Sequence, residues 1–258
     1  MATPLSTPSQ NTEIFAHRRA ALVAAAGPGS VLLISSATLV SRNSDVEHDF
    51  RQDSDFFYLT GFDEPDAVAV LGAGEPPKFV LFVRPKDKKA ETWTGRRAGV
   101  HGAVADWGAA EAFKIGELAT KLPELLEGVE RLGYTYGDDQ DRDKIVVTAA
   151  RLHRTKPREV RTGPDIVFDP TAMLHEQRLR KSDYEIDVLR QSAAISAEAH
   201  HEAMRVCSVG RREYELQAAL EYVFRTSGAA RVGYSSIVAA GDNATILHYN
   251  TNRMSIDD

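Results

Sequence analysis

Two apolar runs, residues 67–71 and 78–83, are joined by the Gly- and Pro-rich segment 72–77 and predict a β-hairpin with a longer loop. That segment contains a Gly-x-Gly, but it lacks the third glycine and the following helix of a phosphate-binding loop, which is therefore not expected. Residues 31–35 form another apolar run and predict a buried strand. The region before residue 169 is thus expected to contain a sheet.

Helical patterns alternate with these strands. Residues 12–26 predict a helix, with Glu13 in its first turn and a Gly-Pro-Gly stop directly after it. Further helices are predicted over residues 111–127 and 141–153, and further strands over residues 131–136 and 166–168. Strands mixed with helices indicate an α/β unit with a mixed sheet.

The pattern changes after residue 169. Ser182 and Glu185 have the spacing of a capping box and predict the start of a long helix that ends near residue 206. A second helix follows Gly210 and ends at Gly228. Two strand-like runs come next, over residues 236–239 and 245–249. A two-stranded ribbon is marginal by itself in water, so we expect this second unit to be incomplete at residue 258.

Composition excludes several classes of protein. The 258 residues carry a formal net charge of −6, which argues against a nucleic-acid partner. Cys207 is the single cysteine, so no intrachain disulfide can form and a reducing compartment is favoured. The first eleven residues lack the pattern of a signal peptide, and the longest apolar run, residues 20–26, is too short to span a membrane. We expect a cytoplasmic protein with no membrane partner.

Four blocks of the sequence resemble signatures of the aminopeptidase P family. Residues 51–65 are similar to RQxSDFxYLTGFxEP, residues 91–99 to ExWxGRRxG, residues 175–182 to HExRxxKS, and residues 240–249 to GENxxxLHY, with Asp242 in place of the glutamate. The resemblance implies a creatinase-type amino-terminal domain with a mixed sheet and flanking helices over residues 12–172. It further implies the opening part of a pita-bread α/β catalytic domain over residues 173–258.

The resemblance also implies a chemistry. The family uses two divalent ions, usually Mn²⁺, to activate a bridging water that attacks the carbonyl before proline. By its place in the motif, His248 is the catalytic residue that steadies the substrate carbonyl and the oxyanion. Tyr234 and Arg158 match substrate-site residues, and Trp93 matches a tryptophan that projects from a neighbouring subunit, which implies a homo-oligomer, a dimer or a tetramer. The metal ligands would follow residue 258, so no metal ligand is assigned and the 258-residue chain is expected to be inactive alone.

Each assigned residue also has an ordinary structural interpretation. A strand histidine is more often hydrogen-bonded in a core than catalytic, and only the motif favours catalysis for His248. Tyr234 could be a sheet aromatic, Trp93 could cover an apolar surface, and the structural interpretation is preferred for Arg158. Two other functions stay open: a stand-alone, non-catalytic amino-terminal module that acts in assembly or binding, and a prolidase-type dipeptidase. Whether the reading frame continues past residue 258 would decide between enzyme and module.

Three other candidates favour structural roles. Glu198 and His201 are spaced as half of a helical metal site, but no second Glu-x-x-His occurs, so a metal is not expected there. The acidic residues between positions 47 and 55 predict a solvated loop that leads into a strand. Cys207 is predicted to pack at the end of a helix.

Overall fold

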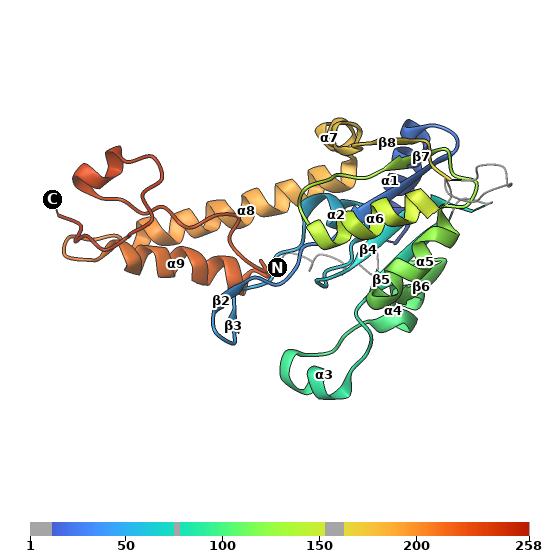
Figure 1. The fold of residues 1–258 in the computed structure, drawn as a ribbon. Helices are drawn as coiled ribbons and strands as arrows, with labels where there is room; N and C mark the ends of the chain where they lie inside the picture. The colour runs from blue at the N-terminus through green and yellow to red at the C-terminus, as the bar shows by residue number, and fades with distance from the viewer. Residues whose placement is uncertain (1–11, 75–77, 153–162, 258) are drawn as a thin grey trace, which may run out of the picture. The chain divides into compact units, whose positions relative to one another are not determined.

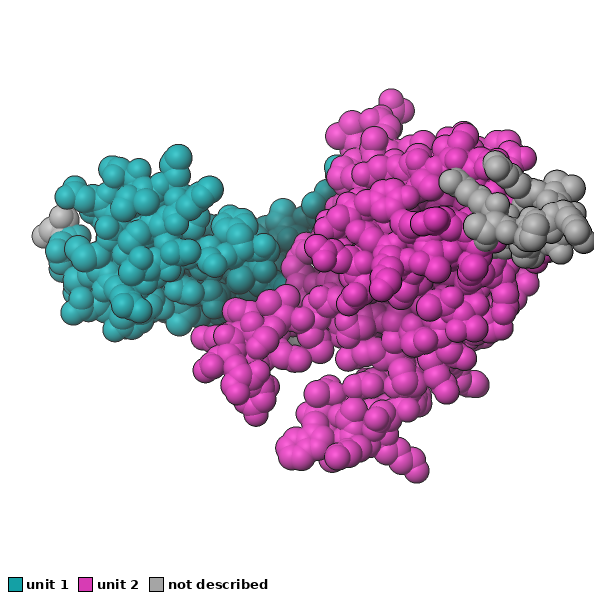
Figure 2. All heavy atoms as spheres, viewed as in Figure 1, with its two compact units in different colours: residues 1–5, 181–258 teal, residues 6–180 magenta. Residues whose placement is uncertain are grey.

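The computed structural model describes residues 12–74, 78–152 and 163–257. The chain divides into two compact units (Figure 2). The part that ends at Arg180, drawn in magenta, is called the first unit below, and the part that begins at Lys181, drawn in teal, is called the second unit. The assignment of domains to residues 12–172 and 173–258 stays a prediction. In the described parts of the chain, no helix is both long enough and apolar enough to cross a membrane.

A six-stranded mixed sheet forms the centre of the first unit (Figure 1). Its strands, in spatial order, are β6 (Glu111–Lys114), β5 (Lys78–Val83), β4 (Val68–Ala73), β1 (Ser30–Ser35), β7 (Arg131–Gly133) and β8 (Ile166–Phe168). The predicted hairpin is confirmed, since β4 and β5 pair antiparallel with Val70 opposite Val80. β4 also pairs antiparallel with β1, whereas β6, β7 and β8 join the sheet by parallel pairing. The predicted mixed sheet is therefore confirmed.

Helices cover both faces of this sheet. One core contains Leu32 and Ile34 of β1 and packs against α1 (Thr12–Ala26), α2 (Ser54–Thr60), α4 (Gly99–Trp107) and α7 (Thr171–Leu179). The other contains Val31 and Leu33 and packs against α5 (Leu118–Leu125) and α6 (Gln140–Leu152). Successive side chains of a strand point to opposite faces, so a strand buried on both sides is apolar throughout. This explains the continuous apolar runs of β1, β4 and β5.

The predicted helix over residues 111–127 is only partly correct. Its first residues form β6, a 3₁₀ turn follows over Ile115–Glu117, and only Leu118–Leu125 is α-helical. Val80 and Phe82 of β5 pair with Glu111 and Phe113 in parallel register. The backbone hydrogen bonds of an available sheet edge thus override the local helical pattern. The predicted helix near residues 141–153 is confirmed as α6.

Two small elements extend from the first unit. One is the hairpin of β2 (Ser41–Asn43) and β3 (Val46–Glu47). The other is α3 (Lys88–Thr94), which has no buried residue and lies on an extension away from the sheet (Figure 1). Neither helix α3 nor hairpin β2–β3 was predicted from the sequence, because both are short and exposed.

The second unit opens with α8 (Asp183–Val206) and α9 (Glu213–Thr226), which pack against each other. The capping box is confirmed: the Ser182 backbone N–H donates to the Glu185 carboxylate at 2.9 Å, and the Glu185 N–H donates to Ser182 Oγ at 3.4 Å. Gly228, two residues past the end of α9, has a φ of 95°. A residue with this left-handed backbone conformation ends a helix, and glycine is favoured there because it has no Cβ.

The two strands predicted in this unit are wrong. Residues 236–239 are irregular, and the 3₁₀ turn Gly241–Thr245 runs into an irregular segment that includes residues 246–249. The backbone N–H groups of Val238 and Ala240 donate to the side chains of Asn252 and Glu213. Side-chain acceptors therefore satisfy donors that a strand would direct to a neighbouring strand.

Candidate functional site

His248 and Tyr234 both lie on the irregular segment that follows α9. His248 is exposed, and Tyr234 is 76% exposed. In the part of the chain that the structure describes, neither side chain makes a hydrogen bond or an ion pair. Both are therefore free to contact a ligand rather than fixed in a core.

A buried carboxylate, that of Glu213, organises the segment around His248. Its Oε1 accepts hydrogen bonds from the Ala240 backbone N–H at 2.8 Å and from Asn243 Nδ2 at 3.3 Å. Its Oε2 accepts from the Tyr249 hydroxyl at 2.7 Å and from the Met254 backbone N–H at 2.9 Å. We call these five residues the Glu213 network. Asn243 and Tyr249 also contact each other, with Nδ2 donating to the hydroxyl oxygen at 3.1 Å.

The charge of Glu213 is stabilised by these donors. Burial acts to raise the pKa of the carboxyl, but the hydrogen bonds from Ala240, Tyr249, Met254 and Asn243 outweigh it and lower the pKa to about 2. Hydrogen bonds to the charged form of a carboxyl have this effect. Glu213 is therefore ionised at neutral pH and cannot readily accept a proton in a reaction.

Asn252, in the irregular segment, makes a second attachment to α9, the helix that carries Glu213. It is 2% exposed, has a φ of 49°, and donates through Nδ2 to Gln217 Oε1 and to the Ser236 carbonyl, both at 2.8 Å. Glu221 accepts from the Ser236 hydroxyl at 2.7 Å. Positions 213, 217 and 221 lie on one face of α9 because they are four residues apart. This polar face holds the segment that follows the helix.

The sequence did not reveal Glu213 or Asn252. Glu213 is the first residue of α9, where an acidic side chain is common because it complements the helix dipole. Asn252 lies in a polar, irregular stretch without periodicity. The one sequence signal is that the motif contains both Asn243 and Tyr249, two hydrogen-bond donors that could share one acceptor.

Trp93 lies in the other compact unit, on α3, and is 81% exposed. Asp87 caps this helix by accepting from the backbone N–H groups of Lys89 at 2.9 Å and Ala90 at 3.0 Å. These backbone hydrogen bonds, that from Ala90 foremost, lower the pKa of Asp87. The Arg97 N–H donates to Glu91 Oε1 at 2.8 Å and closes the turn that follows Trp93. A structured extension thus presents an exposed tryptophan.

The prediction for the acidic residues between positions 47 and 55 is partly correct. Residues 47–49 are exposed, but the segment leads into helix α2 and not into a strand. Asp53 caps α2, with its Oδ1 accepting from the backbone N–H groups of Asp55 at 2.9 Å and Phe56 at 2.8 Å. Asp55 accepts from Arg178 and lies 3.2 Å from His175 Nε2, both on α7. Two blocks that are far apart in the sequence, residues 51–65 and 175–182, therefore meet through one carboxylate.

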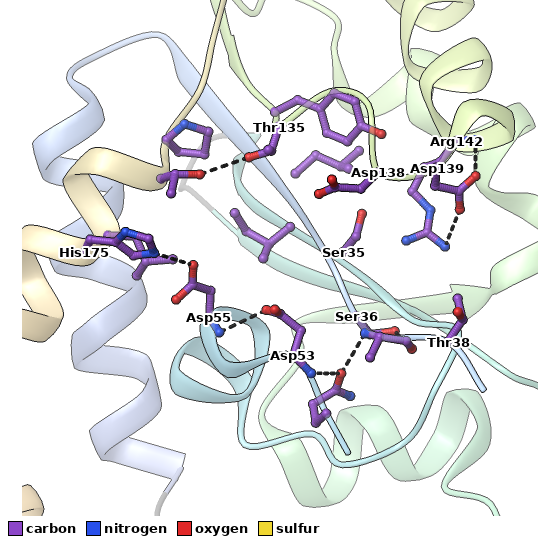
Figure 3. A pocket seen from close by; sticks show the side chains of 18 of the residues that line it. Ser35, Ser36, Thr38, Asp53, Asp55, Thr135, Asp138, Asp139, Arg142 and His175 are labelled. Atoms are coloured by element: carbon purple, nitrogen blue, oxygen red, sulfur yellow. Dashed lines mark hydrogen bonds and ion pairs between the residues drawn. The ribbon is translucent and has the colours of Figure 1, made fainter. Parts of the chain in front are cut away.

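A pocket of about 610 Å³ lies in the first unit, beyond the carboxyl ends of the parallel strands β1, β7 and β8 (Figure 3). Ser35 ends β1 and Thr135 follows β7, at the edge of an α/β sheet where ligands often bind. Asp139 already accepts from the Arg142 N–H at 3.0 Å and pairs with its guanidinium at 3.4 Å, and Asp55 is paired with α7. These contacts favour structural roles for both carboxylates.

The remaining candidates from the sequence concern metal ligands, Cys207 and Arg158. In residues 12–74, 78–152 and 163–257, no group of three or more His, Cys, Asp or Glu side chains could hold a metal ion. Cys207 is exposed at the end of α8, so its predicted packing role is wrong. Arg158 lies outside the described residues.

Comparison with known proteins gives matches across both units. Residues 15–133 match the family "Aminopeptidase P, N-terminal domain", and residues 187–258 match "Metallopeptidase family M24". The chain is 39% identical over 246 residues to an Xaa-Pro aminopeptidase of Escherichia coli, covering 95% of this chain and 56% of that protein. The chain thus spans little more than half the length of this relative.

Solved structures agree with these matches. The aminopeptidase PepP of Pseudomonas aeruginosa is 44% identical with a TM-score of 0.89, over 96% of this chain and 56% of that one. A zinc-substituted aminopeptidase P of Escherichia coli in complex with product is 38% identical with a TM-score of 0.91, over 99% of this chain and 57% of that one.

Proposed function

This chain belongs to the aminopeptidase P family, and on that basis we propose that it takes part in removing the N-terminal residue from peptides with proline at the second position. The observation that carries the proposal is the segment 240–249, in which Asn243 and Tyr249 are held on Glu213 while His248 remains exposed. A group that stabilises an oxyanion needs an accessible donor on a backbone that is held in place, which this segment provides.

The role proposed for His248 is electrostatic. An imidazole N–H aimed at the carbonyl oxygen before proline would stabilise the negative charge that develops there during attack. Tyr234, with an exposed hydroxyl on the same irregular segment, is proposed to contact the substrate. Arg158 is proposed as a further substrate contact by its motif position alone.

The family's chemistry includes divalent metal ions, which activate water by lowering its pKa. We propose manganese, two ions per site, as the native metal. In the described part of the chain, no group of three or more His, Cys, Asp or Glu side chains could hold a metal ion. The part proposed for these residues is to hold and polarise the substrate.

Trp93 is proposed to reach over the substrate pocket of a neighbouring subunit in a homo-oligomer, a dimer or a tetramer. Its exposure on an extension without buried residues supports this role, because a large exposed aromatic side chain is typical of an interface. A cytoplasmic location is proposed because Cys207, the single cysteine, suits a reducing compartment.

The proposal is tested with the protein expressed from its gene and supplied with Mn²⁺. We expect release of the first residue from an Xaa-Pro-Xaa peptide, and little release from the matched Xaa-Ala-Xaa peptide. A chelator should abolish the activity. Equal rates on the two peptides, or no release with Mn²⁺ or Zn²⁺, would overturn the proposal. Cleavage confined to the Xaa-Pro dipeptide would indicate a dipeptidase instead.

A further inference from the structure

We propose that Glu213 is a positioning residue that fixes the segment carrying His248. The inference rests on the proposed function for its catalytic meaning, but its structural part stands on the hydrogen bonds of the Glu213 network.

The hydrogen bonds of this network bracket His248 along the chain. Ala240 and Asn243 donate from before it, and Tyr249 and Met254 donate from after it. Between Asn243 and Tyr249 the chain is exposed, with Leu247 at 89%. A segment tied on both sides to one buried group has few alternative paths, so the backbone at His248 is restricted although its side chain is in solvent.

A carboxylate suits this position better than an amide. Two ionised oxygens offer about four acceptor sites, which matches the four donors that reach Glu213. In a glutamine, one oxygen becomes an NH₂ group, which would face two donors and leave at least the backbone N–H on that side without an acceptor. A buried, unpaired N–H is destabilising, so the segment is expected to move until water reaches it.

The position of Glu213 on helix α9 also favours a carboxylate. Glu213 is the first residue of α9, where the partial positive charge of the helix favours an anion. Its carboxylate is thus held on a regular helix that packs against α8, and not on the irregular segment itself. Because all four acceptor sites are in use, Glu213 is expected to hold the segment and not to contact substrate.

Hydrogen exchange on the 258-residue chain, without substrate, tests the structural part. In Glu213→Gln, we expect the amides of Ala240 and Met254 to exchange about tenfold faster or more, since each loses a charge-assisted hydrogen bond or its fixed geometry. The control is Glu202→Gln on α8, which should leave the exchange of both amides unchanged because the Glu202 carboxylate pairs with the exposed Arg205. Unchanged exchange in Glu213→Gln would overturn the proposal.

Tyr249→Phe provides a second variant should Glu213→Gln fail to fold. It removes one donor and leaves the buried carboxylate with its backbone partners. We expect faster exchange confined to the segment 240–254, together with a shift of the His248 imidazole resonances. Identical exchange and identical resonances would count against the network as the anchor.

Kinetics of the gene-encoded protein test the catalytic part. A positioning role predicts that Glu213→Gln lowers kcat about tenfold or more while KM changes little, because misplacing a donor weakens transition-state binding more than substrate binding. Faster exchange with unchanged kcat would overturn the positioning role. Absence of Xaa-Pro hydrolysis by the wild-type protein would refute the proposed function, and the exchange result would still decide whether Glu213 fixes the segment.

Discussion

The Glu64 carboxylate accepts a hydrogen bond from the Ala98 backbone N–H at 2.6 Å, across 34 residues of sequence. Its other oxygen lies 3.6 Å from the Arg84 guanidinium, and both side chains are mostly buried. The contact joins the end of the block 51–65 to the block 91–99. It thereby fixes the base of the extension that presents Trp93.

Glu64→Ala is expected to loosen that extension. It leaves the Ala98 N–H and the Arg84 guanidinium without their carboxylate, which should cost roughly 1–3 kcal/mol of unfolding free energy in the first unit. Denaturant unfolding and the exchange of the Ala98 amide measure the effect. The control Glu124→Ala removes an exposed pair with Lys121 and should cost about 0–1 kcal/mol. An equal loss of unfolding free energy in the two variants would show that the Glu64 contact stabilises the first unit no more than an exposed ion pair does.

Asp55→Asn is expected to release α7 from α2. The substitution removes the charge that faces both Arg178 and His175, and the loss should be roughly 1–3 kcal/mol. Limited proteolysis within Thr171–Leu179 reports the release directly. Asp187→Asn, which breaks an exposed pair with Arg190 on α8, serves as the control and should leave cleavage of α7 unchanged. Protection of α7 in Asp55→Asn would contradict this assignment.

Stability of the second unit is expected to depend on pH through Glu213. The pKa of Glu213 in the folded protein, about 2, is below its ordinary value of 4.5. The stabilisation that the ionised carboxylate gives is therefore fully present above pH 4.5 and is lost as the pH falls through the folded-state pKa. The loss should therefore occur between about pH 4.5 and pH 2. The measurement compares unfolding of the wild type and Glu213→Gln at pH 6 and pH 2.5. A pH dependence that is the same in both proteins would show that another group is responsible.

The second unit is expected to be cleaved by protease before the first. On α8 and α9, Leu189, Met204 and Tyr222 are 52%, 66% and 69% exposed, although such side chains gain roughly 1.5–3 kcal/mol each when fully buried. The first unit instead has two dense cores. In limited proteolysis of the 258-residue chain, the first cleavage sites should therefore lie within the second unit, between residues 181 and 258. Equal resistance of both units would argue that the exposed faces are covered in solution.

His248→Ala in the gene-encoded protein is expected to lower kcat about 10²–10³-fold while metal content stays nearly unchanged, because a lost oxyanion donor has this effect. Steady-state kinetics beside metal stoichiometry make the measurement. A loss of metal would identify His248 as a ligand, and an unchanged kcat would identify it as structural.

The sequence alone determined the family, the α/β class and the elements whose signals are local. The apolar runs of β1, β4 and β5, the helix α1 and the Ser182–Glu185 capping box all follow from patterns within one segment. The positions of His248 and Trp93 within the family motifs also came from sequence, and their functional roles stay predictions.

Tertiary structure decided how distant polar side chains combine. Glu213 serves as an anchor only because Ala240, Asn243, Tyr249 and Met254 are brought to one carboxylate by the path of the chain. Residues 111–114 form a strand because the edge of β5 is available for pairing. In the segment 236–239, by contrast, the Val238 N–H donates to the Asn252 side chain and not to a neighbouring strand. Local patterns report apolar periodicity, whereas the choice of partner for each hydrogen-bonding group depends on which groups meet in the folded chain.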